Sequence, residues 1–519
     1  MIRKLASQTA VYGLSSIIGR FLNYLLVPIY TRVFVGDLGK AEYGVSTWFY
    51  AIAAFAGVIF TYGMETAFFR FAQKEGATKE RVFSTTLISL IVSSVLFATI
   101  LIFFATPIAN WNKQNGHEMY FRMFAVVFAA DAIATIPFAW LRLQNQAMRF
   151  ATLRLLSIGV NIGLNLLCYV VVPFFAIRGL IAPLDTEGVS VKWMFIINMV
   201  SSVVVLPFFI KEFKMLREGF DIELWRQMLK YAYPIIFMGL AGMINETFDR
   251  YLLNMMLPPE TAKIQLGIYG ANYKLSIIIT LFIQAFRFSA EPFFFAQAKN
   301  EDSRLTNARV TQIFMLVCAT IFIGVLMYID IFKHFIGEEY HEGLAVVPIL
   351  LMANLFLGAY YNLSIWYKLI DKTQLGAIVS LIGAAITLIL NYLWIPTMGY
   401  IGSAWATLIC YFSMAAMSFF LGQKYYPVPY PTRKIIAYLC LALTCYMISD
   451  MIVDNLNPST PLRLVANTFI FTGYCWTVYK LEEKFLQPLL EQLMQKIKKN
   501  KPKSTIIEPK TDQTAPPTE

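Results

Sequence analysis

The chain has 519 residues, of which 58% are hydrophobic and only 14% are charged, and its mean hydropathy is +0.58. Soluble proteins carry about a quarter charged residues, so this composition excludes a soluble globular enzyme or binding domain. The formal net charge is +11. The cysteines lie in apolar stretches without CxxC spacing, and the histidines show no metal-ligand spacing, so we expect no metal centre and no cofactor.

Apolar stretches long enough to cross a membrane recur along the whole chain. About 20 apolar residues span the roughly 30 Å of hydrocarbon in a bilayer. The sequence therefore predicts an all-α integral membrane fold with about 14 transmembrane helices. In chain order the predicted spans cover residues 9–32, 44–66, 83–105, 121–141, 153–173, 191–210, 232–257, 267–290, 309–329, 344–367, 375–395, 400–421, 435–449 and 461–479.

Basic residues follow the even-numbered spans and are sparse in the alternate loops. Lys211, Lys214 and Arg217, for example, follow the sixth span, whereas the link after Pro396 contains no lysine or arginine. This distribution is the one described by the positive-inside rule. It predicts that both termini are cytoplasmic, and it assigns the positive charge to membrane topology rather than to nucleic-acid binding.

The chain repeats itself at an offset of about 226 residues, with six spans in each copy. An even number of spans gives both copies the same orientation, which predicts two lobes related by a parallel pseudo-two-fold axis along the membrane normal, with a cleft between them. We predict an N-terminal lobe at 1–210, a C-terminal lobe at 222–421, two additional spans at 422–480, and a cytoplasmic amphipathic helix with a disordered tail at 481–519. The matching pairs are Tyr24 and Tyr251, Tyr43 and Tyr269, Asn165 and Asn391, and Arg142 and Lys368.

Two basic residues inside the spans are candidates for binding a substrate. Ionisable groups are costly in a bilayer and therefore face the protein interior or water. Arg20, in the middle of the first span, either binds an anion in the cleft or forms an interior ion pair. In the eighth span Lys274, unlike Arg287, has no acidic residue one turn away, which makes it the better cleft candidate of that span. Asn23 and Asn245 are further candidates for the cleft. The cations favour a phosphate-bearing substrate, because arginine and lysine both bind phosphate oxygens.

The seventh span carries a cluster of charged residues, Glu246, Asp249 and Arg250. Glu246 and Arg250 are four residues apart and can pair along one helix face. Asp249 and Arg250 are adjacent, so they point about 100° apart around the helix and are not expected to pair. Either this cluster is a local salt bridge that stabilises the helix, or Asp249 faces the cleft as a cation or proton site.

Other ionisable residues are candidates for coupling or gating. Glu65, at the inner end of the second span, forms either a gate ion pair or a plain interfacial pair, with Arg70 or with a basic residue of a neighbouring span. Asp131, in the middle of the fourth span, either titrates or pairs with the arginine of the first span. Arg287 and Glu291 are four residues apart, which favours a local pair.

Four arginines cluster at the predicted cytoplasmic mouth of the cleft. The positive-inside rule alone explains basic residues at this level. The functional alternative is that they attract an anionic head group. The four are Arg70, Arg142, Arg149 and Arg154.

Several segments of the chain carry a resemblance to a known family. They are Gly13 to Arg32 with Pro28, Glu42 to Gly44, Gly63 to Arg70, Tyr233-Pro234, Gly239 to Leu253, Gly267 to Tyr269, Asn391 to Pro396 and Gly399 to Ala404. These segments resemble the polysaccharide-transporter branch of the multidrug/oligosaccharidyl-lipid/polysaccharide exporter superfamily. This branch contains the O-antigen-type flippases, and the lipid II flippase is more distantly similar. The resemblance covers roughly residues 1–421.

The resemblance implies that the chain moves a polyprenyl-pyrophosphate-linked oligosaccharide from the cytoplasmic to the periplasmic leaflet of the bacterial inner membrane. The two lobes would alternate between inward-open and outward-open states while the lipid tail stays among the membrane lipids. Arg20 matches the first-span arginine of the family, and Lys274 lies where members often have a basic residue. A polysaccharide polymerase or glycosyltransferases are the implied protein partners. Coupling to H⁺, to Na⁺ or to the membrane potential stays open.

Three alternatives remain. A cation-coupled multidrug exporter is disfavoured by the basic residues of the cleft and by the two additional spans. The lipid II flippase itself is disfavoured because that family has a more basic cavity. A polyprenyl-dependent membrane glycosyltransferase or polymerase generally needs a large external loop with catalytic residues, and no outer loop here exceeds roughly 20 residues. We therefore predict a transporter and no catalytic residues.

Overall fold

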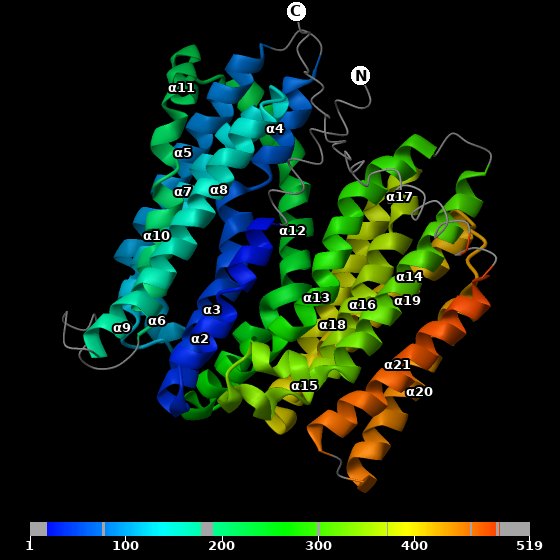
Figure 1. The fold of residues 1–519 in the computed structure, drawn as a ribbon. Coiled ribbons are helices and arrows are strands. Elements are labelled where there is room, and N and C mark those ends of the chain that lie inside the picture. The colour runs from blue at the N-terminus through cyan, green and yellow to red at the C-terminus, as the bar shows by residue number, and fades with distance from the viewer. Residues whose placement is uncertain are drawn as a thin grey trace, which may run out of the picture. The chain divides into compact units, whose positions relative to one another are not determined.

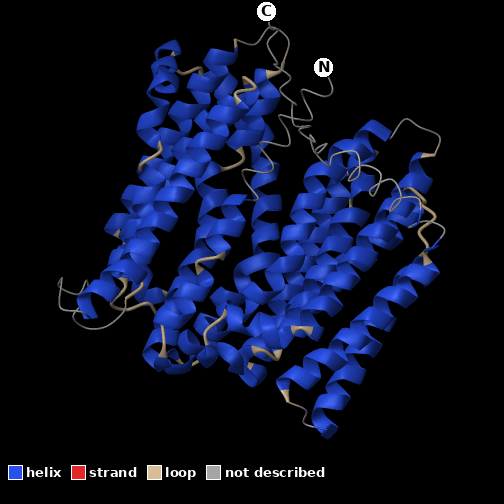
Figure 2. Cartoon of the chain, in the orientation of Figure 1, coloured by secondary structure: helices blue, strands red, loops and turns tan. Residues whose placement is uncertain are grey.

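The computed structural model describes residues 18–74, 78–177, 190–297, 302–370, 372–456, 459–483 and 487. All regular structure in these ranges is helical, without a strand (Figure 2), which confirms the predicted all-α fold. The chain divides into two compact units, Met1–Ala442 and Leu443–Glu519. The predicted amphipathic helix and tail after 483 lie outside the described residues, apart from Gln487.

The N-terminal half of the first unit is a bundle of long helices joined by short helical turns (Figure 1). Residues 18–24 are helical. The helices that follow are α2 (Val27–Val33), α3 (Gly36–Thr61), α4 (Met64–Ala72), α5 (Lys79–Phe103), α6 (Ala105–Trp111), α7 (Glu118–Leu143), α8 (Ala147–Leu166), α9 (Val172–Ile177), α10 (Lys192–Val203) and α11 (Ile210–Phe213).

The C-terminal half of the first unit runs from α12 to the first part of α20. Its helices are α12 (Ile222–Met256), α13 (Pro259–Gln297), α14 (Ser303–Met327), α15 (Ile329–Phe332), α16 (Val346–Leu363), α17 (Ile365–Leu369), α18 (Thr373–Met398), α19 (Tyr400–Tyr425) and α20 (Thr432–Leu456). Between α15 and α16 the chain forms two short 3-10 turns, Lys333–Phe335 and Glu338–Gly343. The second unit contains the end of α20 and α21 (Thr460–Leu481).

Eleven helices within the described residues are long and apolar enough to cross a membrane, so the chain is a multi-pass membrane protein. They coincide with eleven of the predicted spans. The first predicted span lies mostly outside the described residues. The seventh and fourteenth correspond to α12 and α21, which are helical but are not among the eleven. Helix α12 carries the charge cluster at Glu246, Asp249 and Arg250.

Helix boundaries follow local backbone chemistry. The break between α3 and α4 falls at Tyr62 and Gly63, which have φ values of 31° and 73° and so cannot continue a right-handed helix. Helix α12 is capped at its N-terminus by Asp221, whose Oδ1 accepts hydrogen bonds from the backbone N–H groups of Glu223 (3.1 Å) and Leu224 (3.0 Å). These bonds, together with Arg81, hold the pKa of the Asp221 carboxyl below its ordinary value.

Helix α12 connects the two halves of the first unit. Near its start, Met228 and Ala232 belong to the buried core of the N-terminal half, with Phe68, Phe83 and Trp140. Further along, the Asn245 amide donates to the Ser380 carbonyl of α18 at 3.0 Å. The helix therefore packs on both bundles, although the repeat places all of it in the second copy.

The two halves meet most closely along α3 and α13, where glycines face one another. A Cβ atom at Gly44 would overlap the carbonyl oxygen of Lys263, and one at Gly267 would overlap that of Lys40. Backbone therefore lies directly against backbone, an approach that small residues allow in membrane proteins.

Candidate functional site

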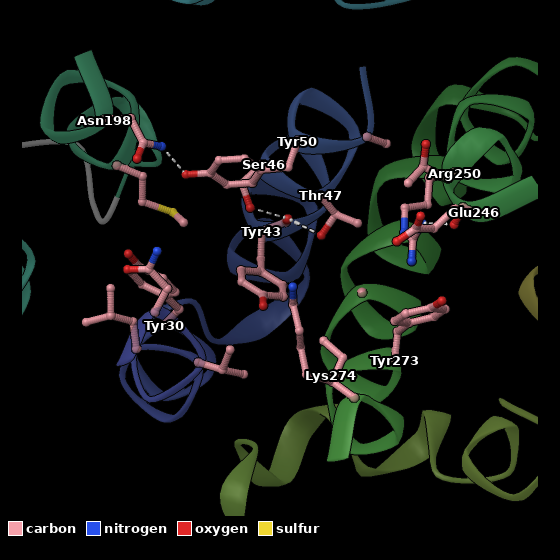
Figure 3. Close-up of a pocket in the computed structure, with 18 of the residues that line it drawn as sticks. Tyr30, Tyr43, Ser46, Thr47, Tyr50, Asn198, Glu246, Arg250, Tyr273 and Lys274 are labelled. Carbon is pink, nitrogen blue, oxygen red and sulfur yellow. Dashed lines mark hydrogen bonds between the residues drawn. The ribbon is translucent and has the colours of Figure 1, made fainter. Parts of the chain in front are cut away.

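A cavity of about 390 Å³ lies between the two halves of the first unit. Helices α2, α3, α8 and α10 form one wall, and α12 and α13 form the other (Figure 3). This volume falls within the range of about 300–1,000 Å³ that ligand pockets occupy. The lining residues are Asn23, Leu26, Val27, Tyr30, Tyr43, Ser46, Thr47, Tyr50, Ala51, Asn161, Met194, Asn198, Glu246, Thr247, Arg250, Gly270, Tyr273, Lys274 and Ile277.

Among the described residues that line this cavity, the charged side chains all come from the C-terminal half. Arg250 is held in place: its guanidinium lies 4.3 Å from the centre of the Tyr273 ring, and its Nη1 donates to the Glu246 carbonyl at 2.9 Å. Nη1 also lies 3.4 Å from Oδ1 of Asp249. Arg250 thus carries a partly neutralised charge, because a carboxylate is already beside it.

For the seventh span, the structure corrects the prediction that Asp249 and Arg250 do not pair, and of the two alternatives it favours the local salt bridge over a cleft-facing Asp249. Asp249 and Arg250 do pair, because the long arginine side chain can fold back along the helix to its neighbour. Asp249 is buried, 3% exposed, rather than directed into the cleft. The Tyr269 hydroxyl donates to its Oδ2 at 2.7 Å, so both carboxylate oxygens have partners within the protein. The contact from Arg250 to Glu246 reaches a backbone carbonyl, not the predicted carboxylate.

Lys274 projects from α13 into the cavity, towards Tyr43 of α3 (Figure 3). No hydrogen bond or ion pair to Lys274 is present within the part of the chain that the structure describes. An ammonium group in a membrane interior is costly without a counter-charge. An anionic ligand would therefore gain the most binding free energy by pairing with Lys274.

The opposite wall is neutral and rich in hydrogen-bonding groups. Tyr43, Ser46, Thr47 and Tyr50 follow one another on α3 with the spacing of one helix face. Ser46 and Thr47 donate to the Tyr43 carbonyl at 2.7 and 3.0 Å, and the Asn198 amide donates to the Tyr50 hydroxyl. The charged residues of the sequence do not predict this stripe, although polar residues at helical spacing in an apolar span could have revealed it.

Tyr30 and the asparagines Asn23, Asn161 and Asn198 complete the neutral wall. The Asn161 amide donates to Oδ1 of Asn198 at 2.9 Å, and the Tyr30 hydroxyl donates to Oδ1 of Asn165 at 2.7 Å. Asn23 also lines the cavity. Amides and hydroxyls both donate and accept hydrogen bonds, which is the chemistry that a sugar hydroxyl requires.

Contacts between the halves close the end of the cavity that the predicted topology places outside. The loop between α15 and α16 packs on α2 and on the start of α3. Nζ of Lys40 lies 2.9 Å from Oε1 of Glu342, and the Tyr340 hydroxyl donates to the Phe34 carbonyl at 2.7 Å. The Gly337 N–H donates to the Thr31 hydroxyl at 2.9 Å. We call this set of contacts the outer closure.

The four predicted mouth arginines do not line the cavity. Arg142 pairs with Glu65, and the guanidinium of Arg154 lies 4.3 Å from the centre of the Phe138 ring. Arg70 lies over the Tyr231 ring of α12 at 4.5 Å. The pair between Glu65 and Arg142 joins α4 and α7 within one half of the unit. It is therefore an interfacial pair with a neighbouring span rather than a gate between the halves.

Arg149 forms the most buried of these contacts. Its guanidinium bonds both carboxylate oxygens of Glu212, with Nη2 at 2.9 Å from Oε2, and Glu212 is only 4% exposed. We expect Glu212→Gln to destabilise the folded protein by about 1–3 kcal/mol, because it leaves a partly buried guanidinium without its carboxylate. Thermal unfolding in detergent measures the effect. Glu218→Gln, an exposed acid in the same segment, should unfold like the wild type, and equal unfolding temperatures for both variants would contradict the expectation.

The remaining predicted residues are dispersed. Arg20 is exposed and lies outside the set of lining residues. Asn245 is buried against α18 and α19, where the Tyr411 hydroxyl donates to its carbonyl at 3.2 Å. The Arg287 guanidinium lies 4.0 Å from the centre of the Tyr361 ring, and the side chain of Glu291 lies outside the described residues. Of the four residues predicted to bind substrate, Asn23 and Lys274 reach the cavity.

Comparison with solved structures identifies the fold. A structure described as the lipid II flippase MurJ in an inward closed conformation has a TM-score of 0.69 at 15% identity, over 90% of this chain and 98% of that one. An inward-facing multidrug resistance MATE family transporter of the MOP superfamily has a TM-score of 0.56 at 13% identity, over 83% and 95%. A mutant of the Vibrio cholerae MATE transporter VcmN gives 0.53 at 11% identity, over 81% and 96%.

Comparison of sequences identifies the family. No curated protein sequence matches the chain. The family model described as polysaccharide biosynthesis protein matches residues 5–296, which include both walls of the cavity. This match covers more than half of the chain, so the chain belongs to the polysaccharide biosynthesis protein family and has the fold shared by MurJ and the MATE transporters.

Proposed function

We propose that this protein is a flippase that moves a polyprenyl-pyrophosphate-linked oligosaccharide from the cytoplasmic to the periplasmic leaflet of the bacterial inner membrane, in the manner of O-antigen-type flippases. The family match and the transporter fold support a role in polysaccharide export. The observation that carries the proposal is the cavity between the halves, with hydrogen-bonding groups on one wall and the ammonium of Lys274 on the other.

The two walls fit the two chemical parts of such a head group. Lys274, which has no partner within the described residues, can bind an oxygen of the pyrophosphate. The hydroxyls and amides around Tyr43, Tyr50 and Asn198 can bind sugar hydroxyls. The polyprenyl tail, which is apolar, gains nothing from a polar cavity and would stay in the surrounding lipid. The proposal contains no catalytic step and no cofactor.

Transport through this cavity requires the outer closure to open. The proposed cycle loads substrate from the cytoplasmic side while the closure is formed. The contacts of Lys40, Thr31 and Phe34 with the α15–α16 loop must then break so that the head group can leave. A proton or sodium gradient can drive this cycle, and so can the membrane potential acting on the negative charge of the substrate. Glycosyltransferases supply the substrate in this scheme, and a polysaccharide polymerase consumes it.

A deletion strain tests the proposal directly. Loss of the flippase should leave the polyprenyl-linked oligosaccharide on the cytoplasmic leaflet and remove the surface polysaccharide. Extraction of the lipids, followed by mass spectrometry, measures the accumulation and identifies the sugars. An unchanged lipid profile together with sensitivity to cationic drugs would contradict the proposal and favour a multidrug exporter.

The outer closure offers a further test. Cysteines at Lys40 and Glu342, joined by a cleavable thiol cross-linker, should stop flipping in proteoliposomes almost completely, because the exit then cannot open. Cleaving the linker should restore the rate. Each single-cysteine variant treated with the same reagent controls for labelling of native cysteines such as the exposed Cys440. Undiminished flipping in the cross-linked protein would show that the closure does not lie on the exit path.

A further inference from the structure

A second cavity, of about 350 Å³, lies within the N-terminal half of the first unit. Helices α3, α7 and α10 line it, and Asp131 of α7 projects from its wall. Asp131 is exposed although it lies at the middle of a membrane-spanning helix, because its carboxylate faces this cavity rather than packed side chains. The cavity therefore accounts for a charge that the bilayer itself would not tolerate.

The two cavities share a wall. Tyr50 and Asn198 line both of them, and the Asn198 amide donates to the Tyr50 hydroxyl (Figure 3). The Tyr50 and Asn198 side chains therefore stand between the two cavities at this wall. A ligand in the central cavity thus lies next to the second one.

The size of the second cavity indicates a molecule rather than an ion. A single water needs about 10–15 Å³ of such space, so a proton or a bare cation would leave most of this volume to water. Hard cations also need several oxygen ligands that converge on one point. Within the described residues there is no group of three His, Cys, Asp or Glu side chains that could hold a metal ion.

The lining of the second cavity matches a sugar. Asp131 supplies carboxylate oxygens, which only accept hydrogen bonds when ionised, while Thr135 and Ser202 supply hydroxyls. The rings of Phe124 and Phe128 provide apolar surface for the faces of a sugar ring. Arg154 of α8 interacts electrostatically with Asp131, and Ser202 hydrogen-bonds to it. A lipid chain would place apolar groups against this carboxylate and add no hydrogen bond to it, which is unfavourable.

We propose that the second cavity is a glycan subsite that receives the distal sugars of the head group, while the proximal sugar and the pyrophosphate occupy the central cavity. This inference rests on the proposed function and extends it to the length of the oligosaccharide. The first sugar and the pyrophosphate reach only the central cavity, so a short substrate does not use the subsite. A long substrate is held by both cavities and depends on the shared wall at Tyr50 and Asn198.

Gly57 of α3 allows the subsite to be filled without disturbing the fold. It lines the second cavity but not the central one, and a Cβ atom there meets nothing within 4 Å. Gly57→Leu therefore places a side chain in the open space. Gly159→Leu is the matched control, because this glycine of α8 is also helical and exposed, has nothing within 4 Å of its Cβ position, and lines neither cavity.

The experiment compares two synthetic probes in proteoliposomes, a polyprenyl pyrophosphate carrying one sugar and one carrying the full oligosaccharide. We expect Gly57→Leu to flip the short probe at the wild-type rate and the long probe about tenfold more slowly, which corresponds to about 1.4 kcal/mol of lost binding. Gly159→Leu should flip both probes normally. An equal fall for both probes, or no change for either, would overturn the subsite. Failure of the wild type to flip either probe would refute the flippase itself.

Asp131→Asn separates the subsite from an ion-coupling site. As a sugar ligand, Asp131 should matter only for the long probe, and the response of short-probe flipping to an imposed pH or sodium gradient should stay as in the wild type. If the variant instead loses that response, with both probes slowed alike, the second cavity serves the coupling ion and the proposal is overturned. Arg154 is the charged group that interacts with the Asp131 carboxylate. The Arg154 side chain is therefore left unchanged in Asp131→Asn and in Gly57→Leu.

Discussion

Replacing Lys274 with alanine is expected to weaken binding of the polyprenyl-pyrophosphate oligosaccharide by roughly 10- to 100-fold. A hydrogen bond to a charged group contributes about 1.5–3 kcal/mol, and each 1.4 kcal/mol is about a factor of ten in affinity. Lys274 has no acidic partner within the described residues, so its loss removes attraction for an anion and relieves no existing pair. Binding of the lipid-linked oligosaccharide in detergent and flipping in proteoliposomes both measure the effect.

Three variants show what Lys274 contributes. Lys274→Arg keeps the charge and should retain part of the activity, whereas Lys274→Gln keeps a hydrogen-bond donor and should behave like alanine. Lys263→Ala on the same helix is the control, because Lys263 interacts electrostatically with Glu42 and lies outside the set of cavity-lining residues. Normal binding by Lys274→Ala would refute the assignment of the anionic group to this wall.

The sequence predicted Lys274 and Arg20 on the same grounds, and only one of them reaches the cavity. Both are isolated cations inside apolar spans. Which of the two faces a cavity depends on the rotation of each helix about its axis, and packing against neighbouring helices determines that rotation. The α3–α13 contact and the Tyr273 side chain beside Arg250 position the wall that holds Lys274. None of these contacts is visible in a one-dimensional pattern.

The seventh span shows a different limit. The direction of each side chain was inferred from helical rotation alone, which separates Asp249 from Arg250. That inference ignores the length of the arginine side chain. The Arg250 side chain is long enough to bring its Nη1 within 3.4 Å of Oδ1 of Asp249. Tyr269, which belongs to the next helix, completes the environment of Asp249. Partners from another helix cannot be read from the spacing within one span.

The structure gives a physical reason for part of the internal repeat. The repeated Tyr-Gly pair falls at Tyr43-Gly44 and Tyr269-Gly270, on the two helices that bring the halves together. Gly44 faces the carbonyl of Lys263, and Gly270 faces the Thr47 side chain. The tyrosines differ in their contacts: Tyr43 lines the cavity, and Tyr269 binds Asp249. The repeat therefore keeps the close approach of the helices, while the two halves use their tyrosines differently.

Gly44→Ala is expected to have the second large effect, because it acts on the α3–α13 contact, which includes the carbonyl of Lys40, a residue of the outer closure. A methyl group at Gly44 would overlap the Lys263 carbonyl, so α3 and α13 would have to separate. Overpacking of this kind costs about 1–3 kcal/mol, and a bias of that size shifts a two-state equilibrium about 5- to 150-fold. The variant should populate the state with the outer end open and should load cytoplasmic substrate poorly.

Two measurements separate this effect from simple misfolding. Flipping in proteoliposomes should fall at least about fivefold, while a cysteine introduced at Thr47, inside the cavity, should react faster with a membrane-impermeant thiol reagent added from the outside. Gly159→Ala, at an exposed helical glycine with open space at its Cβ position, is the control and should change neither. If the closure depends on α3 and α13, steric separation of these helices must expose the cavity. A Gly44→Ala protein that flips normally, or that loses flipping without faster labelling from the outside, would therefore show that the α3–α13 contact does not control access.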